Sequence, residues 1–219
     1  MNIVLLGPPG AGKGTQGERI AKRFGVPKLA TGDVLREAVR AGTPSGREAK
    51  AFMERGDLVP DAVILGIMKE ALTRPEAARG VVLDGVVRTV PQAEGLERVM
   101  DEVHRRLDAV LLFDVDEEEL VRRISTRTVC EKCQTPYTGR EPGSTCERCG
   151  GRLVRRKDDE PEAVRHRMRA YRDQTRPVID WYRCRAEAPG GPRFLEVDAV
   201  GEVDEVTRRV LSVLGEWSN

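Results

Sequence analysis

Residues 7–15 read Gly7-Pro8-Pro9-Gly10-Ala11-Gly12-Lys13-Gly14-Thr15. An apolar run from Ile3 to Leu6 precedes this stretch, and a helix-like pattern that includes Ile20 and Phe24 follows it. Strand, glycine-rich loop, lysine and helix in this order form a phosphate cradle, because backbone N–H groups converge on phosphate oxygens and the helix N-terminus adds partial positive charge. The sequence therefore predicts a phosphate-binding loop, with Lys13 supplying a full charge. A plain glycine-rich turn is the alternative.

The loop departs from the usual pattern at one position. A Ser or Thr normally follows the lysine directly and reaches Mg²⁺, whereas here Gly14 intervenes and the hydroxyl is on Thr15. This departure indicates a subclass that holds the metal mostly through water. Asp84 ends the apolar run Val81–Leu83, and its carboxylate is the candidate for holding Mg²⁺ through water.

Composition limits the kinds of partner. The chain has 219 residues and a formal net charge of +1. This length is enough for one core with a small insertion or two. The charge is too balanced to attract nucleic acid or membrane through a strong field. Of the 37 basic residues, 30 are Arg. The planar guanidinium suits phosphate, although a compositional habit of the genome explains most of them. With no signal-like or bilayer-spanning segment, we expect a cytoplasmic protein.

Apolar, β-branched runs alternate with helical periodicity along the chain. The expected strands are Asn2–Leu6, Lys28–Ala30, Val81–Leu83, Ala109–Val115 and Arg193–Val197. The expected helices begin near Lys13, Asp61, Pro91, Glu117, Pro161 and Glu202. This alternation predicts an α/β fold, a parallel five-stranded sheet flanked by helices. The helix from Pro161 should bend near Pro177, since proline lacks the backbone donor.

Two stretches interrupt the alternation and are interpreted as insertions. They divide the chain into a core of residues 1–30, 60–126 and 158–219, a first insertion at 31–59 and a second at 127–157. Neither insertion can bury much surface alone. Both should therefore lie on the main sheet as small mobile lobes.

The second insertion carries two Cys-x-x-Cys pairs, Cys130/Cys133 and Cys146/Cys149. This spacing allows four thiolates to close a tetrahedral Zn²⁺ site, and a site filled by four protein ligands is structural. Two disulfides or four idle thiols are the alternatives, and a reducing compartment disfavours the disulfides. A zinc ribbon surrounded by arginines could also bind nucleic acid, but aromatic residues for stacking are scarce in this segment.

Six arginines on separate elements are candidates for holding phosphates: Arg36, Arg88, Arg123, Arg127, Arg156 and Arg167. Arg123 and Arg127 are four residues apart, which predicts that they share one helix face. Phosphoryl transfer mainly needs cations that hold donor and acceptor in line and neutralise the equatorial oxygens. These side chains could meet Lys13 only if both insertions fold over the loop.

The motifs together resemble those of adenylate kinases of the longer, zinc-bearing bacterial type. The matching segments are residues 7–15, 31–36, 83–85, 88–89, 91–93, the four cysteines and 156–159. The resemblance implies a P-loop nucleoside monophosphate kinase fold, with 31–59 as the AMP-binding lobe and 127–157 as the lid. It implies reversible, Mg²⁺-dependent transfer of a phosphoryl group from ATP to AMP, giving two ADP, by a monomer with a structural zinc in the lid.

The resemblance also assigns residues. Those implied for ATP are Gly10, Ala11, Gly12, Lys13, Gly14, Thr15, Arg123, Arg127 and Tyr137. Those implied for AMP are Thr31, Gly32, Arg36, Asp57, Leu58, Val59, Gly85, Arg88, Gln92, Arg156 and Arg167, with Gln92 reading the adenine edge. The implied catalytic residues are Lys13, Arg88, Arg127, Arg156 and Arg167. Asp158 and Asp159 would brace the closed lid.

Three segments depart from the family pattern. Val86-Val87 replaces Phe-Pro, Thr128 replaces a second arginine beside Arg127, and the stretch 134–145 between the cysteine pairs is short. A cis bond before a non-proline residue costs roughly 3–4 kcal/mol, so we expect a trans bond between Val86 and Val87, a displaced Arg88 and weaker AMP binding. A nucleotide-binding scaffold with little activity, and a P-loop ATPase with a nucleic-acid-binding ribbon, are the rival functions.

Overall fold

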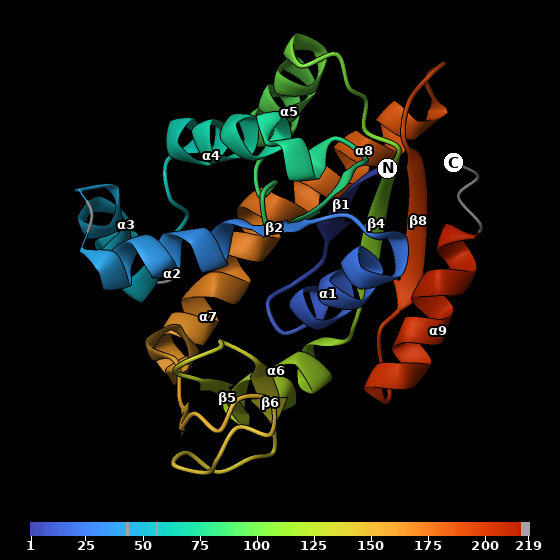
Figure 1. Ribbon diagram of the computed structural model, residues 1–219. Coiled ribbons are helices and arrows are strands. Elements are labelled where there is room, and N and C mark those ends of the chain that lie inside the picture. Colours follow the sequence, from blue (N-terminus) through green and yellow to red (C-terminus); the bar gives the residue numbers. More distant parts are fainter. Residues whose placement is uncertain (43, 56, 216–219) are drawn as a thin grey trace.

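A five-stranded parallel sheet forms the centre of the chain. The computed structural model describes residues 1–42, 44–55 and 57–215 (Figure 1). The strands lie in the order β2-β3-β1-β4-β8, and each neighbouring pair is parallel. Their bounds are β1 Asn2–Leu6, β2 Lys28–Ala30, β3 Val81–Asp84, β4 Ala109–Asp114 and β8 Arg193–Asp198. The predicted α/β fold is confirmed.

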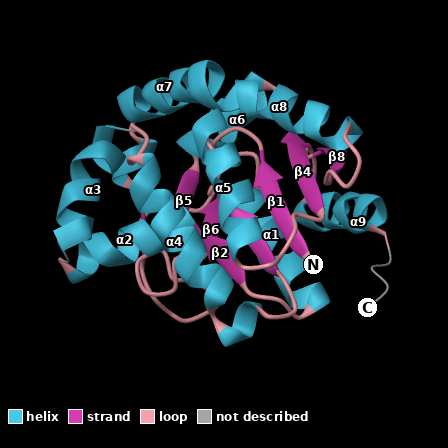
Figure 2. Cartoon of the chain, turned by 90° about the horizontal axis from the view of Figure 1, so that it is seen from above, coloured by secondary structure: helices cyan, strands magenta, loops and turns pink. Residues whose placement is uncertain are grey.

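Helices cover both faces of this sheet (Figure 2). Their bounds are α1 Lys13–Phe24, α2 Thr31–Ala41, α3 Pro44–Arg55, α4 Asp61–Thr73, α5 Val90–Glu102, α6 Glu117–Ser125, α7 Pro161–Ala170, α8 Arg176–Glu187 and α9 Val203–Leu214. Short 3₁₀ turns lie at Pro75–Ala77 and Lys157–Asp159. Among these described helices, none combines the length and apolar composition that a membrane crossing requires.

Alternation along the strands divides the core into two layers. In β1, Val4 and Leu6 pack into a cluster with residues of α4, α5 and α8, whereas Ile3 and Leu5 pack into a cluster with residues of α1 and α9. Successive strand residues point to opposite faces, so a fully apolar strand must be covered on both sides. Because the strands are parallel, their carboxyl ends lie at one edge of the sheet, where α1 begins.

The segment from α7 to α8 contains the irregularity expected near Pro177. A π-helical turn, Tyr171–Thr175, separates the two helices, and Pro177 occupies the first turn of α8. Because proline has no N–H to donate, the α-helical hydrogen bond to the carbonyl of Asp173 cannot form. The wider turn directly before the proline is consistent with that loss.

The second insertion contains a small antiparallel sheet that the sequence did not predict. Its strands β5 (Arg127–Cys130), β6 (Pro136–Thr138) and β7 (Leu153–Val154) lie in the order β6-β5-β7. In Figure 1 this lobe lies beyond α6, on the side of the molecule away from α5. Strands of two to four residues are too short to show an alternating pattern.

The prediction that Arg123 and Arg127 share a helix face is wrong. Helix α6 ends at Ser125, and Arg127 is the first residue of β5. The hydroxyl groups of Ser125 and Thr126 donate to the carbonyl of Arg122 at 3.0 and 2.9 Å. Side-chain hydroxyls of this kind compete with helix propagation, so the helix ends two residues before Arg127.

Candidate active site

The loop between β1 and α1 has the geometry of a phosphate cradle. Gly10 has φ +86°, and a Cβ added there would lie 2.8 Å from Cγ1 of Ile124, so this position requires glycine. The Lys13 ammonium donates to the carbonyl oxygens of Gly7 and Pro8 at 2.7 and 2.8 Å. Burial lowers the pKa of Lys13 to about 8, and the charge of Asp84 opposes that shift.

A cavity of 540 Å³ opens over this loop. Its lining includes Lys13, Asp84 and all six candidate arginines: Arg36, Arg88, Arg123, Arg127, Arg156 and Arg167. The structure therefore brings these arginines together around one cavity. The loop residues from Gly10 to Thr15 also line this cavity.

Tyr137 is the one residue assigned to ATP that is not part of this lining. Its neighbours in β6, Pro136 and Thr138, line the cavity, while the Tyr137 hydroxyl lies 3.2 Å from Sγ of Cys146. Alternate residues of a strand face opposite sides, so the tyrosine lies on the cysteine side of the lobe. Its hydroxyl contacts the candidate metal centre rather than the cavity.

A second cavity, of 60 Å³, adjoins the first. All eleven residues that the sequence assigned to AMP line it: Thr31, Gly32, Arg36, Asp57, Leu58, Val59, Gly85, Arg88, Gln92, Arg156 and Arg167. Leu35, Met53 and Ile64 also line it. Sequence reasoning missed these three because an apolar side chain that lines a pocket has the same helical periodicity as one in the core.

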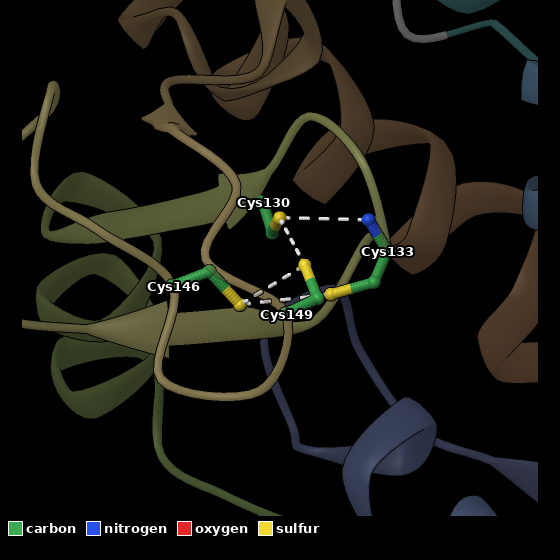
Figure 3. A group of neighbouring side chains, drawn as sticks. All are labelled: Cys130, Cys133, Cys146 and Cys149. Carbon is green, nitrogen blue, oxygen red and sulfur yellow. Dashed lines mark hydrogen bonds between the residues drawn. The ribbon is translucent and has the colours of Figure 1, made fainter.

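The four cysteines of the second insertion form one cluster (Figure 3). Their sulfur atoms all lie within 4.8 Å of one another, and none of the four is in a disulfide. The Sγ atoms of Cys130 and Cys149 are 3.4 Å apart, and those of Cys133 and Cys146 are 3.6 Å apart. Four thiolates around one zinc ion would lie about 3.8 Å apart. The donor set and its spacing therefore fit a tetrahedral Zn²⁺.

The backbone of this lobe is shaped around the sulfur atoms. The amide of Cys133 donates to Sγ of Cys130 at 3.4 Å. A Cβ at Gly151 would lie 2.7 Å from the same sulfur, so a larger residue would displace it. Contacts to a ligand atom from groups that do not themselves bind the metal orient that ligand.

Comparison with known proteins places this arrangement in a family. A model of the adenylate kinase family matches residues 5–187. An adenylate kinase of Gemmatimonas aurantiaca is 65% identical over 216 residues, covering 98% of this chain and 99% of that protein. The chain belongs to the adenylate kinase family. It is also similar to adenylate kinases of Methanothrix thermoacetophila, 44% identical over 99% of this chain and 100% of that protein, and of Archaeoglobus fulgidus, 42% identical over 98% of each chain.

Two aspartates hold three of the arginines that line the larger cavity: Arg127, Arg156 and Arg167. Nε of Arg127 donates to Asp159 at 2.7 Å, and Nε of Arg156 donates to Asp158 at 2.8 Å. Arg167 reaches both carboxylates, at 3.1 and 3.3 Å. Burial opposes ionisation of Asp158, but the charges of Arg156 and Arg167 outweigh it and hold its pKa below the usual range. Burial lowers the pKa of Arg167 to about 10.

Gln92 is fixed in orientation at the wall of the smaller cavity. Its side chain accepts from the amide of Arg88 at 2.7 Å and donates to Asp61 at 2.6 Å. A primary amide has two donors and two lone pairs on oxygen. One donor and one acceptor therefore remain for a ligand.

Arg88 lines both cavities although Val86-Val87 precedes it. The described backbone contains no cis peptide bond, so the predicted trans bond between Val86 and Val87 is confirmed. Both valines are buried in the core layer that includes α4 and α5. Nε of Arg88 donates to the carbonyl of Gly85 at 3.0 Å, and burial lowers the pKa of Arg88 from its ordinary value.

Thr128, where the family pattern has a second arginine, does not line the larger cavity. It is buried, and its hydroxyl donates to the carbonyl of Arg140 at 3.3 Å within the second insertion. Because Thr128 alternates with Arg127 and Val129 along β5, it faces away from the phosphate cradle. An arginine at this position would share that orientation.

Proposed function

We propose that this chain catalyses reversible transfer of the terminal phosphoryl group of ATP to AMP, giving two ADP. The observation that carries the proposal is the junction of the two cavities, which share seven lining residues. Four of these are arginines: Arg36, Arg88, Arg156 and Arg167. Two phosphorylated ligands that meet at this junction would have their phosphates side by side, with cations around the oxygens that gain charge in phosphoryl transfer.

The donor would occupy the larger cavity. Lys13 and the loop amides would hold the β- and γ-phosphates of ATP, with Arg127 and Arg167 at the transferred group. A Cβ at Gly14 would lie 3.5 Å from a carboxylate oxygen of Asp84, so this carboxylate lies at the start of α1 and fits a Mg²⁺ held through water. The ion would supply positive charge to the phosphates.

The acceptor would occupy the smaller cavity. Arg36 and Arg88 would hold the AMP phosphate, and Gln92 would offer its remaining donor and acceptor to the adenine edge. The backbone of residues 57–59 would close the base pocket. Weaker AMP binding caused by Val86-Val87 remains part of this proposal.

Residues 31–59 would form the AMP-binding lobe and residues 127–157 the lid, on a core of 1–30, 60–126 and 158–219. The contacts of Arg127 and Arg156 with Asp159 and Asp158 connect the lid to the segment before α7. A closed lid would exclude water, so that the phosphoryl group reaches AMP and is not lost to hydrolysis. A structural Zn²⁺ on the four cysteines would hold the lid in shape.

The direct test is ADP formation from ATP with AMP, CMP, UMP or GMP as acceptor. We expect AMP to be preferred, and equal phosphorylation of CMP or UMP would contradict the proposal. Lys13→Met should lower turnover by about 10²- to 10³-fold, while circular dichroism and thermal unfolding show an intact fold. Normal turnover by this folded variant would equally contradict the assignment.

A further inference from the structure

The cavity end between α6 and the segment after β8 differs chemically from the phosphate end. Its lining includes Ala199, Gly201, Val203 and Val206 beside Arg123. Charged and polar side chains also line this end: Gln16, Glu202 and the hydrogen-bonded group of Glu119, Arg122 and Arg123. The other groups there are small or apolar, unlike the converging arginines found around Lys13. A cavity end of this composition suits the flat, apolar faces of a nucleobase, whereas the arginine-rich end suits phosphates.

Arg123 reaches this end with two edges of its guanidinium already bound. Nε donates to Oε1 of Glu119 at 2.6 Å, and one Nη donates to the carbonyl of Ala199 at 2.9 Å. Its side chain is 16% exposed. A guanidinium that donates through two edges cannot present a full fork to a phosphate, but its planar face remains available, and such faces stack on bases.

Glu119 is itself held in place. Nε and one Nη of Arg122 donate to its two carboxylate oxygens, each at 2.7 Å, and Asp116 accepts from its backbone amide at 2.8 Å. Its side chain is 14% exposed. The hydrogen bonds from Arg122, followed by those from Arg123, lower the pKa of Glu119 to about 2. The carboxylate is therefore ionised and fixed across the working pH range.

We propose that Glu119 is a positioning residue that holds the guanidinium of Arg123 as a flat platform for the nucleobase of the phosphoryl donor. The inference rests on the proposed function, since it places the donor nucleotide in the larger cavity. Glu119 acts on the base and leaves the phosphates to Lys13 and the other arginines. Loss of its charge should therefore weaken binding of a nucleotide without weakening binding of phosphates alone.

Glu119→Gln keeps the size of the side chain and removes its charge. We expect the dissociation constant for ATP, measured directly by calorimetry, to rise about three- to ten-fold, a part of the stacking energy usual for one base. The affinity for inorganic tripolyphosphate, which has no base, should stay unchanged. KM for ATP should rise with little change in kcat. Glu118→Gln is the matched control, since Glu118 is exposed and outside the cavity lining.

A double-mutant cycle tests whether Glu119 acts through Arg123. In the background of Arg123→Lys, which keeps the charge and loses the plane, Glu119→Gln should have no further effect on ATP affinity. Equal weakening of ATP and tripolyphosphate, unchanged ATP affinity in Glu119→Gln, or full additivity of the two changes would each overturn the inference. Failure of the unmodified protein to bind ATP at all would instead contradict the proposed function.

Discussion

At the scale of single residues, the chemistry of Lys13 depends on its surroundings. The ammonium is buried under the glycine-rich loop and donates to two backbone carbonyls. Removing a charge from water disfavours the protonated form, and nearby Arg88 and Arg167 lower the pKa of Lys13 further. The same ammonium would have its ordinary pKa on the surface of the molecule.

A pH profile tests this effect. The protonated form of Lys13 binds phosphate, and its fraction in the free protein falls as the pH rises past about 8. We therefore expect kcat/KM for ATP to fall above about pH 8, because that parameter reports the free enzyme. Bound phosphates favour the ammonium, so kcat should fall only at higher pH. Binding of adenosine, which lacks phosphates, serves as the control, and a flat kcat/KM profile up to about pH 10 would argue against this assignment.

Val86 and Val87 are buried directly before the arginine that lines both cavities. If they weaken AMP binding, the double change Val86→Phe, Val87→Pro should lower KM for AMP and raise turnover. Phenylalanine adds volume to a packed core, which typically costs about 1–3 kcal/mol of stability, so the thermal midpoint must be measured alongside the kinetics. Unchanged kinetics in a folded variant would show that these valines are neutral.

At the scale of elements, the second insertion, residues 127–157, has little core of its own. Its buried apolar cluster consists of Leu153 together with Cys130 and Cys146, and the other cysteines and Tyr137 pack against it. A lobe this small normally needs a metal or a disulfide to fold. The four thiolates replace the apolar core that the lobe lacks.

We expect one zinc per chain by elemental analysis. The variant Cys130→Ser, Cys133→Ser should lose the metal, and its thermal midpoint should fall by about 5 °C or more, as a loss of roughly 2 kcal/mol implies for a chain of this size. Cys184→Ser is the control, because Cys184 is exposed and outside the cluster. Native protein with well under one zinc, or full stability in the double variant, would contradict a structural role for zinc.

At the scale of the whole molecule, the net charge is small and the exposed apolar side chains are scattered. The formal net charge is +1. Among the described residues, the large hydrophobic side chains that are exposed are Val34, Val121, Val200 and Val203. They lie on α2, α6, the loop after β8 and α9, so they do not form one broad apolar face of the kind that marks an obligate interface.

We expect a monomer, as the resemblance to adenylate kinases implies. Sedimentation velocity should give a single species near 24.3 kDa, and specific activity should not change on dilution. A concentration-dependent dimer would require an interface that these exposed valines do not supply. Dissociation accompanied by loss of activity would contradict the prediction most directly.

The sequence by itself determined what depends on local spacing. Three such patterns lie within short stretches of the chain. The glycine loop before Lys13 predicted the phosphate cradle, and the two Cys-x-x-Cys pairs predicted the cysteine cluster. The alternation of strands and helices predicted the parallel sheet. Packing decided what depends on contacts between distant segments. Strand β5, which begins at Arg127, forms by pairing with β6 and β7, and this pairing turns Tyr137 toward the cysteines.

The tertiary structure also decided which partner each arginine has. Arg123 meets Ala199, 76 residues away, and Arg127 meets Asp159, 32 residues away. Both pairs form because the sheet brings β4 beside β8 and the second insertion lies against the segment before α7. When only the sequence is known, an arginine can be a phosphate ligand, a stacking surface or a solvated surface group. Its burial and its hydrogen-bond partners select among these roles, and both are properties of the folded chain.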